Sequence, residues 1–295
     1  MDRRDAGSIS GAAVSAWNNN TLASRFRSHD GPVVAFFDVD GTLVYRDPVD
    51  GPGDYPSERV CKSVRAFTEQ GGIPVLSTGR SRMGVTHLLD GLPFRGHVSM
   101  DGAHAAFDDT VIVDRCFPRD LLQRIIVEAL RIDMPVLFEG TELCIELNTC
   151  GESLFNCGPV VKNAHELYAT GLGLRFGKID FIDDALEAYH NSEFLQRELT
   201  YYDVGDGYHE LVMPGVSKGS GATALLNYLK VRMGVMPSRA LAFGDSENDL
   251  SLFEVADIGI AMGQAASHVR NAADYVTDSC ANDGVATALE HLGLI

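Results

Sequence analysis

VVAFFDVDGT, at residues 33–42, joins a continuous apolar run to a pair of carboxylates. An apolar run without alternating polar residues is typical of a strand that is buried on both faces, as in a parallel sheet. Asp38 follows the run directly, and a carboxylate there is costly to desolvate without a cation. Asp40 lies two residues on, so its side chain shares a face with that of Asp38 in extended chain, and Gly41 permits a turn. The stretch therefore predicts a core strand of an α/β sheet that ends in an acidic site.

Strand and helix patterns alternate on both sides of the middle of the chain. After the first strand, a helix, a strand, a helix and a strand are predicted at 57–70, 73–77, 81–89 and 98–100. The far end repeats this alternation, with helices and strands in turn at 219–233, 240–243, 247–255, 258–261, 265–272 and 275–277. The alternation predicts the α/β fold class, with a Rossmann-like, doubly wound parallel sheet as the core.

The middle of the chain has a different pattern. It combines an amphipathic helix with two hairpins, at 121–130, at 135–139 with 142–147, and at 200–204 with 209–213. We therefore expect an inserted α+β cap domain at 113–212, between two parts of a core domain at 31–112 and 213–295. Residues 1–30 are rich in Ser, Asn, Ala and Gly and have no sustained apolar period, which predicts a flexible tail.

Three further pieces stand at or near the ends of predicted strands, where open α/β sheets bind ligands: STGR at 77–80, Lys218, and GDSEND at 244–249. Asp245 ends a strand, and Asp249 lies four residues later on the same face of the following helix. A single Asp at such a place is more often a helix cap or a turn residue. Four at strand ends, beside a lysine and a threonine, favour a site. Carboxylates that close together need a hard divalent cation, and an oxygen-rich set suits Mg²⁺.

These groups suit phosphoryl transfer. A carboxylate can attack phosphorus and form an aspartyl-phosphate, which splits a difficult hydrolysis into two displacements. Mg²⁺, a lysine, a hydroxyl and backbone N–H groups can neutralise the phosphoryl oxygens. A second carboxylate can protonate the leaving oxygen and later accept a proton from water. Each part of this chemistry has a candidate among the residues above.

The four motifs together resemble those of the haloacid dehalogenase superfamily. DVDGT at 38–42, STGR at 77–80, Lys218 in GVSKG and GDSEND at 244–249 are similar in order and spacing to the Cof-like sugar-phosphatase branch, in which a large α/β cap lies between the second and third motifs. The resemblance covers about 31–295. It implies a Mg²⁺-dependent phosphatase for sugar phosphates or related metabolites.

The resemblance also implies a role for each matching residue. Asp38 would be the nucleophile and a Mg²⁺ ligand, and Asp40 would be the general acid/base and would give its backbone carbonyl to the metal. Asp245 would ligate Mg²⁺, and Asp249 would support the metal site directly or through water. The residues that bind the phosphoryl group would be Thr78, Gly79, Lys218 and Asn248.

Two positions depart from the family pattern. Asp101-Gly102-Ala103 stands where the family often has Asn-Gly-Ala, and we expect the extra charge to disfavour an anionic substrate body. Gly263-Gln264-Ala265 stands where Gly-Asn-Ala is common, a milder change that keeps the amide on a longer stem.

The charge of the chain excludes some partners. The 295 residues hold 24 Lys and Arg against 41 Asp and Glu, a formal net charge of −17. Nucleic-acid binding depends on Lys and Arg that neutralise phosphates, and anionic membrane surfaces attract the same basic residues. We therefore expect no nucleic-acid or membrane partner. The pattern carries no signal for an oligomeric state.

The six cysteines show no C-x-x-C pair, so we expect reduced thiols that pack as small apolar residues. Cys144, Cys150 and Cys157 as metal ligands would be the alternative, with irregular spacing and no histidine pair. No apolar run approaches the length of a membrane span, and the N-terminus lacks a hydrophobic signal core. These features together predict a cytoplasmic protein.

Other readings of the sequence remain as alternatives. A phosphomutase of the phosphomannomutase type would share the nucleophile and a similar cap but would need a bisphosphate activator. A non-catalytic binding module on the same scaffold is the alternative from another class. GSGATA at 219–224 fits a dinucleotide-binding pattern, but Arg239 occupies the place of the expected acid.

Overall fold

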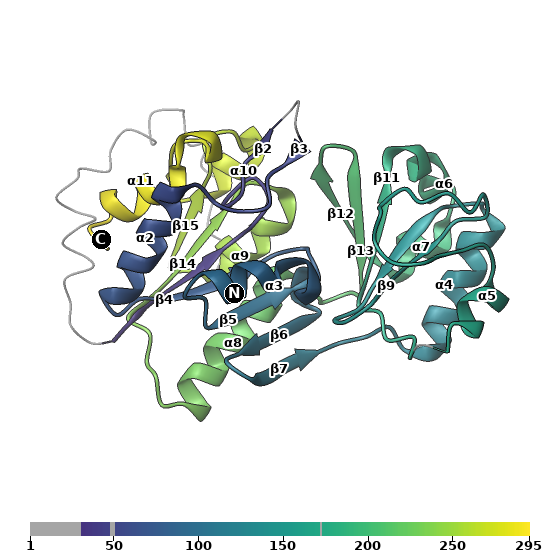
Figure 1. Ribbon diagram of the computed structural model, residues 1–295, viewed down its shortest axis with the longest axis horizontal. Helices are drawn as coiled ribbons and strands as arrows, with labels where there is room; N and C mark the ends of the chain where they lie inside the picture. Colours follow the sequence, from purple (N-terminus) through teal and green to yellow (C-terminus); the bar gives the residue numbers. More distant parts are fainter. Residues whose placement is uncertain (1–30, 48–50, 172) are drawn as a thin grey trace, which may run out of the picture.

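Two β-sheets, each with its own helices, organise the protein (Figure 1). The computed structural model describes residues 31–47, 51–171 and 173–295, and the predicted tail at 1–30 lies outside them. Within these residues, a small two-stranded sheet also pairs β2 (Arg46–Asp47) with β3 (Gly51–Pro52).

The larger sheet has eight strands in the order β16-β15-β14-β1-β4-β5-β6-β7. Neighbouring strands are parallel from β16 to β5, whereas β6 pairs antiparallel with β5 and with β7. The parallel part confirms the predicted α/β core, and the β6–β7 hairpin is an element that the sequence pattern did not predict. The strands are β1 (Val33–Phe37), β4 (Ile73–Ser77), β5 (Gly96–Ser99), β6 (His104–Phe107), β7 (Thr110–Asp114), β14 (Arg239–Gly244), β15 (Ile258–Ala261) and β16 (Tyr275–Val276).

Helices cover both faces of this sheet, which makes it doubly wound. Along β1, Ala35 and Phe37 enter one hydrophobic cluster while Val34 and Phe36 enter the other. The first cluster includes residues of α2 (Glu58–Glu69), α3 (Arg82–Gly91) and α11 (Gly284–His291). The second includes residues of α8 (Lys218–Arg232), α9 (Leu250–Val255) and α10 (Ser267–Ala272). Helices therefore cover both faces of β1, and this explains why the strand is apolar throughout.

The smaller sheet has six strands in the order β10-β9-β8-β11-β13-β12. Its pairs are antiparallel except for β10 with β9, and the two predicted hairpins, β8–β9 and β12–β13, are confirmed. β11 had no counterpart among the predicted strands. The strands are β8 (Val136–Glu139), β9 (Cys144–Leu147), β10 (Val160–Val161), β11 (Lys178–Ile182), β12 (Thr200–Gly205) and β13 (Tyr208–Val212).

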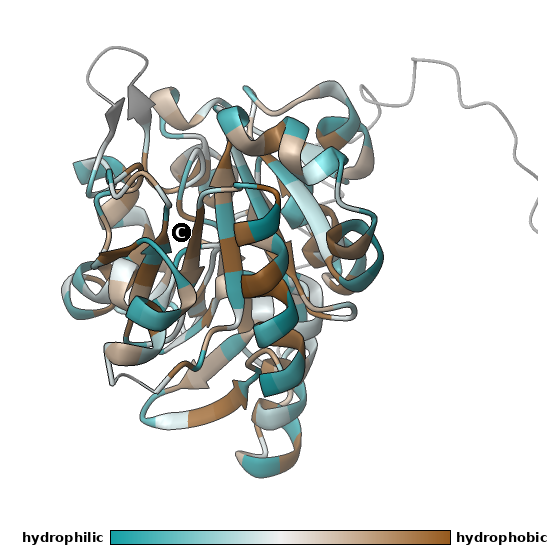
Figure 2. Cartoon of the chain, turned by 90° about the vertical axis from the view of Figure 1, so that its right-hand side faces the viewer, coloured by the Kyte–Doolittle hydropathy of each residue, from teal (hydrophilic) through white to brown (hydrophobic). Residues whose placement is uncertain are grey.

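One face of the smaller sheet packs on helices, and the other face is polar. Ile179 and Phe181 of β11 join the hydrophobic cluster under α4 (Arg119–Arg131), α5 (Ala164–Ala169), α6 (Leu186–His190) and α7 (Glu193–Glu198). Lys178 and Asp180 alternate with them and therefore lie on the opposite face. Figure 2 shows apolar and polar residues together in single helices, as expected for helices that cover a sheet.

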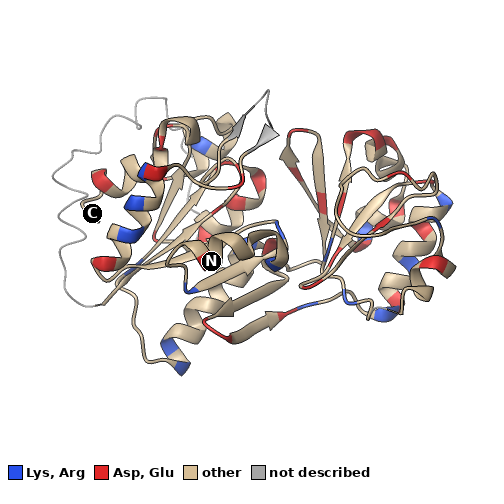
Figure 3. Cartoon of the chain, viewed as in Figure 1, with Lys and Arg blue, Asp and Glu red and all other residues tan. Residues whose placement is uncertain are grey.

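Four short 3₁₀ helices complete the described elements: η2 (Met100–Gly102), η3 (Asp183–Ala185), η4 (Glu247–Asp249) and η5 (Cys280–Asn282). Acidic residues occur over both halves of the molecule (Figure 3), in keeping with 41 Asp and Glu against 24 Lys and Arg. In the part of the chain that the structure describes, no helix combines the length and the apolar character that a bilayer span requires.

The cysteines require a correction. Cys144 and Cys157 form a disulfide, with their Cα atoms 6.3 Å apart, so the expectation of six free thiols is wrong for this pair. The cause is the return of the chain after β9, because β10 pairs beside β9 and brings the intervening loop back to the start of that strand. Cys61, Cys116, Cys150 and Cys280 are free.

Candidate active site

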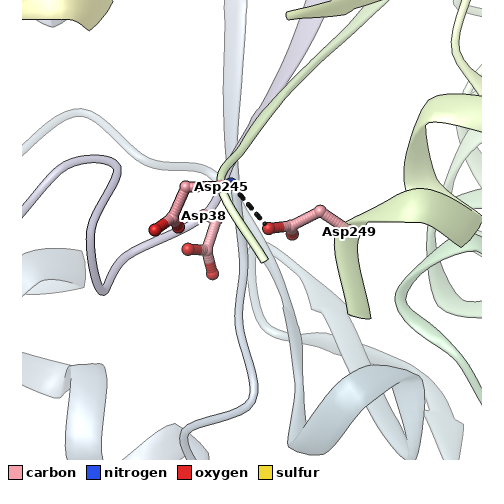
Figure 4. Close-up of side chains that lie close together, drawn as sticks. All are labelled: Asp38, Asp245 and Asp249. Carbon is pink, nitrogen blue, oxygen red and sulfur yellow. Dashed lines mark hydrogen bonds between the residues drawn. The ribbon is translucent and has the colours of Figure 1, made fainter. Parts of the chain in front are cut away.

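The acidic residues meet where two neighbouring parallel strands end. Phe37 of β1 is in register with Phe243 of β14, and the Asp38 N–H donates to the Phe243 carbonyl at 3.0 Å. Asp38 and Asp245 therefore leave the same edge of the sheet. The η4 turn returns Asp249 to that edge, and one carboxylate oxygen from each of the three Asp residues lies within 4.8 Å of the others (Figure 4).

Lys218 connects two of these carboxylates. Its Nζ donates to Asp38 Oδ1 at 2.8 Å and to Asp249 Oδ1 at 2.7 Å, and the lysine is 1% exposed. Lys218 is the first residue of α8, which begins with a capping box between Ser217 and Ser220. The cap fixes the start of the helix and with it the direction of the lysine side chain.

The Asp249 carboxylate also closes the η4 turn. Its Oδ2 accepts hydrogen bonds from the backbone N–H of Asp245 at 2.9 Å and of Ser246 at 3.1 Å. The same carboxylate thus holds the loop after β14 and faces Lys218. This double use explains the four-residue spacing of GDSEND, because the turn brings the last Asp back over the first.

Burial dominates the electrostatics of the site. It raises the pKa of Asp38 well above its usual value, against the opposing effect of Lys218 and with a further rise from Asp249. Burial, and then Asp249, raises the pKa of Asp245 to about 7. The pKa of Lys218 is also raised, because Asp249 and Asp38 outweigh the effect of burial on the ammonium. Three carboxylates beside one ammonium thus make a site that favours an additional cation.

The donor set fits Mg²⁺. The three candidate ligands are all carboxylate oxygens, with no sulfur or imidazole among the described groups that cluster there. Hard cations of this kind prefer such oxygens. Asp38, Asp245 and Asp249 are therefore the residues that could hold the metal, and the Asp40 carboxylate is not among the described groups that cluster there.

Gln264 ties the loop after β1 to Asp245. Its Nε2 donates to the Gly41 carbonyl at 2.5 Å and to Asp245 Oδ2 at 3.3 Å, and its Oε1 accepts from the Cys280 N–H at 2.9 Å. Thr42 Oγ1 donates to Asp245 Oδ1 at 3.3 Å. The longer side chain of Gln264 thus bridges two loops, a role that the sequence did not predict.

Gly41 is required by the same packing. Its φ is +77°, in the region that side chains disfavour, and a Cβ at this position would collide with the Asp245 carboxylate.

Asp40 lies apart from the three clustered carboxylates and is bound by an arginine. Arg80 Nε donates to Asp40 Oδ2 at 2.7 Å, and a terminal nitrogen of the guanidinium donates to Oδ1 at 2.6 Å. Arg80 is the last residue of STGR, and this partner was not foreseen from the sequence. Arg80 and Asp40 meet because Arg80 follows β4, Asp40 follows β1, and these two strands are neighbours in the sheet. The strand order cannot be derived from one sequence.

Thr78 and Gly79 lie beside these groups after β4. The Thr78 N–H donates to the Val98 carbonyl at 2.8 Å, and its Oγ1 accepts from the Arg80 N–H at 3.1 Å. A Cβ on Gly79 would collide with Glu210 Oε1, so the glycine allows that carboxylate to approach the loop.

Asn248 joins the two halves of the site. Its Nδ2 donates to Asp101 Oδ1 at 3.0 Å and to Glu210 Oε2 at 3.1 Å. Asp101 is fully buried and is not among the described residues that line the cavity. The expectation that its charge repels an anionic substrate is therefore corrected, because the side chain faces Asn248 and Glu210 instead.

Asp101 and Glu210 form a carboxyl–carboxylate pair. Burial, and then the Glu210 charge, raises the pKa of Asp101 well above its usual value. Burial alone would raise the pKa of Glu210 too, but Lys178 and a hydrogen bond from Asp101 hold it below its usual value. Asp101 therefore acts as the protonated partner and Glu210 as the ionised one.

A cavity of about 840 Å³ connects the acidic site to the polar face of the smaller sheet. Its walls include Asp38, Asp40, Thr78, Gly79, Lys218, Asp245 and Asn248 from the large-sheet half. The opposite wall includes Glu139, Lys178, Asp180 and Glu210. None of these four residues is among the site candidates named from the sequence above. The alternation of charged and apolar residues in KIDFI at 178–182 was the available signal.

Comparison with known families decides the class of the protein. The family model described as haloacid dehalogenase-like hydrolase matches residues 35–289. The chain belongs to this family. The resemblance seen in the four motifs is thus confirmed, and this haloacid dehalogenase-like hydrolase carries the motifs at one edge of its larger sheet.

Named relatives of this hydrolase include phosphatases. It is 31% identical over 221 residues to a phosphoglycolate phosphatase of Natronomonas pharaonis, covering 68% of this chain and 94% of that protein. It is 26% identical over 282 residues to a Streptococcus pyogenes serotype M6 protein named for phosphatase and peptidyl-prolyl cis-trans isomerase activities. That match covers 89% of this chain but 54% of the relative, so the chain spans about half the length of that protein.

Solved structures support the fold. BT1666 of Bacteroides thetaiotaomicron, described among phosphatases of the haloalkanoate (HAD) enzyme superfamily, matches with a TM-score of 0.73 and 25% identity. The match covers 92% of this chain and 98% of that one, so both sheets take part in it.

Proposed function

We propose that this haloacid dehalogenase-like hydrolase is a Mg²⁺-dependent phosphatase that hydrolyses a small phosphorylated metabolite, such as a sugar phosphate, through an aspartyl-phosphate on Asp38. The coarser class, a phosphoric monoester hydrolase, is the one that its family and named relatives support. One observation carries the finer proposal. The Lys218 ammonium holds the carboxylates of Asp38 and Asp249 beside that of Asp245 at the wall of a cavity.

Asp38 and Asp40 divide the proposed chemistry between them. An oxygen of the Asp38 carboxylate attacks phosphorus, the bond from phosphorus to the leaving oxygen breaks, and Asp40 gives that oxygen a proton. Asp40 then takes a proton from water, whose oxygen attacks the phosphorus of the aspartyl-phosphate. Inorganic phosphate leaves and the Asp38 carboxylate is restored.

Arg80 positions Asp40 for this exchange. Its guanidinium donates to both Asp40 oxygens, and a guanidinium has no acceptor. When Asp40 carries a proton, its hydroxyl must therefore turn from Arg80 toward another acceptor, and the leaving oxygen of a bound substrate is such an acceptor. The N–H group released from Asp40 is then available to the phosphoryl group.

The remaining predicted residues bind and neutralise the phosphoryl group. We assign this role to Thr78, Gly79, Lys218 and Asn248, which line the cavity around Asp38. When bound by Asp38, Asp245 and Asp249 with the backbone carbonyl of Asp40, Mg²⁺ supplies charge neutralisation to the phosphoryl oxygens.

The domain bounds belong to the same proposal. We take 31–112 with 213–295 as the core and 113–212 as a cap that excludes water and selects the leaving group. A cytoplasmic location also stays a prediction. The Cys144–Cys157 disulfide bears against it, because cytosolic thiols are usually kept reduced, and thiol counting on protein isolated under alkylating conditions tests it.

The test is hydrolysis of p-nitrophenyl phosphate by the wild type and by Asp38→Asn, each with Mg²⁺ and with EDTA. Turnover by the wild type that requires Mg²⁺ and falls at least a thousandfold in Asp38→Asn is the expected result. Asp109→Asn, in the exposed β6–β7 turn, is the matched control and should keep full activity. Full activity of a folded Asp38→Asn enzyme would refute the mechanism.

A further inference from the structure

A buried lysine organises the polar face of the smaller sheet. Lys178 Nζ lies 2.7 Å from Glu210 Oε1, 2.8 Å from Asp180 Oδ1 and 3.2 Å from Glu139 Oε2, and its side chain is 4% exposed. An ammonium has three donors, and three carboxylates surround this one. The three carboxylates outnumber the one ammonium, so the group as a whole does not attract a second anion of a substrate.

The sheet register places the four residues on one face. Lys178 of β11 is opposite Glu139 of β8, and Asp180 of β11 is opposite Glu210 of β13. All four residues line the cavity that contains Asp38. Glu210 is at the core side of this group, because it accepts a hydrogen bond from Asn248 and packs against Gly79. The group thus forms the wall next to the predicted phosphate-binding residues.

The charge of this wall is negative. Among the described residues of 113–212 that line the cavity, five are acidic and one is basic: Glu139, Lys178, Asp180, Asp203, Asp206 and Glu210. Burial raises the pKa of Asp180 well above its usual value; Lys178 opposes the shift, and the charges of Glu139 and Glu210 add to it. Glu139 and Glu210 thus oppose a further negative charge at Asp180, and they would oppose one on a substrate in the same way.

The carboxyl groups of the wall are hydrogen-bond acceptors. Glu139 Oε2 is buried, and it accepts no hydrogen bond from any residue that the structure describes, despite the ion contact with Lys178. Ionised carboxylates accept hydrogen bonds and donate none, so a hydroxyl or ammonium group of a ligand is the partner that such a wall suits. The acceptors and the negative charge of the wall thus indicate the same kind of ligand.

We infer that Glu139, Asp180 and Glu210, organised by Lys178, select a phosphomonoester whose leaving group presents hydroxyl or amino donors and exclude one that carries a second negative charge. The inference rests on the proposed phosphatase function and narrows its substrate class. It also separates this chain from its relative named for phosphoglycolate, a phosphomonoester whose leaving group carries a carboxylate.

Matched substrate pairs test the inference. Sorbitol 6-phosphate and 6-phosphogluconate differ by a hydroxymethyl group in place of a carboxylate, and 2-hydroxyethyl phosphate and phosphoglycolate differ in the same way. We expect kcat/KM to be at least tenfold higher for the hydroxymethyl member of each pair. For a compound that is not turned over, its inhibition constant against p-nitrophenyl phosphate replaces kcat/KM. Ratios within twofold in both pairs, or a preference for the carboxylates, would overturn the inference.

Variants locate the discrimination. Glu139→Gln and Asp180→Asn each replace a carboxyl group of the wall by an amide of nearly the same shape, and each should reduce the ratio at least threefold. Glu142→Gln, on the 76% exposed side chain in the turn between β8 and β9, should leave it unchanged. Unchanged ratios in both wall variants would show that this wall does not discriminate.

The assays distinguish failure of the substrate inference from failure of the proposed phosphatase function. If p-nitrophenyl phosphate is hydrolysed with dependence on Mg²⁺ and Asp38 while the paired ratios stay near one, only the substrate inference fails. If p-nitrophenyl phosphate hydrolysis is absent or independent of Asp38, the proposed function fails first.

Discussion

Replacement of Asp101 by Asn tests the carboxyl–carboxylate pair directly. Asp101 has φ +50° and ψ +32°, a left-handed conformation that Asn adopts readily. The Asn248 amide donates to Asp101 Oδ1, and an amide at position 101 keeps an oxygen for this bond. Its NH₂ group can donate to Glu210 as the protonated acid does. Asp101→Asn should therefore preserve the fold and the hydrogen bonds while it removes one proton-binding group.

The magnitude follows from the raised pKa of Asp101. Between the ordinary pKa of an aspartate and the raised folded value, the folded wild type holds a proton that the unfolded chain lacks. Stability from such a group is fully present at low pH and is lost as pH rises, by about 1.4 kcal/mol per pH unit. The Asn variant has no such loss. Its free energy of unfolding, relative to the wild type, should therefore rise with pH, with a limiting slope of about 1.4 kcal/mol per pH unit wherever only the folded wild type holds the proton.

Urea unfolding at pH 6, 7 and 8 in EDTA measures this difference. EDTA removes bound metal, so the comparison reports the protein groups alone. Asp109→Asn, with its exposed side chain, is the control and should run parallel to the wild type at all three pH values. If Asp101→Asn also runs parallel to the wild type, Asp101 does not hold its proton in the folded state and the assignment of the pair is wrong.

Three further predictions concern the site and the disulfide. Lys218→Met leaves the buried carboxylates of Asp38 and Asp249 without their cation. It should therefore lower the free energy of unfolding by about 3–5 kcal/mol at pH 7 in urea titrations. Part of this loss should be recovered at pH 5, because the carboxyls protonate. Mg²⁺ at a hundred times its Kd should stabilise the wild type by about 2.7 kcal/mol in thermal melts, and an equal gain in Asp245→Asn would contradict the metal assignment. Cys157→Ser should cost about 3 kcal/mol under non-reducing conditions, whereas Cys150→Ser, at a free exposed cysteine, should cost little; equal effects would argue against the disulfide.

The buried parallel strands were predictable because their residues face apolar neighbours on both sides. Val33–Phe37, Ile73–Ser77 and Ile258–Ala261 have the predicted bounds. The strand ends then placed Asp38 and Asp245, and the site followed from their adjacency.

Elements with polar or short patterns were not predictable in this way. KIDFI of β11 alternates charged and apolar residues, because one face packs on helices and the other lines the cavity. The β6–β7 hairpin consists of two short strands at the edge of the sheet, with little apolar length to mark them. Contacts across the chain, such as Arg80 with Asp40 and Asn248 with Asp101, depend on strand order and side-chain direction, neither of which one sequence contains.

The central place of β1 in the larger sheet has a consequence for biosynthesis. β1 is made early, yet β14, the neighbouring strand that brings Asp245 beside Asp38, is about two hundred residues later in the chain. The carboxylates of Asp38, Asp245 and Asp249 cannot meet until the ribosome has released residue 249. During most of translation the edge of β1 that pairs with β14 has unpaired backbone N–H and C=O groups, whereas the smaller sheet, built wholly from residues 136–212, has all its strands sooner. Pairing over such long sequence separations is slow, so catalytic competence should arrive as a late step in the maturation of the nascent chain.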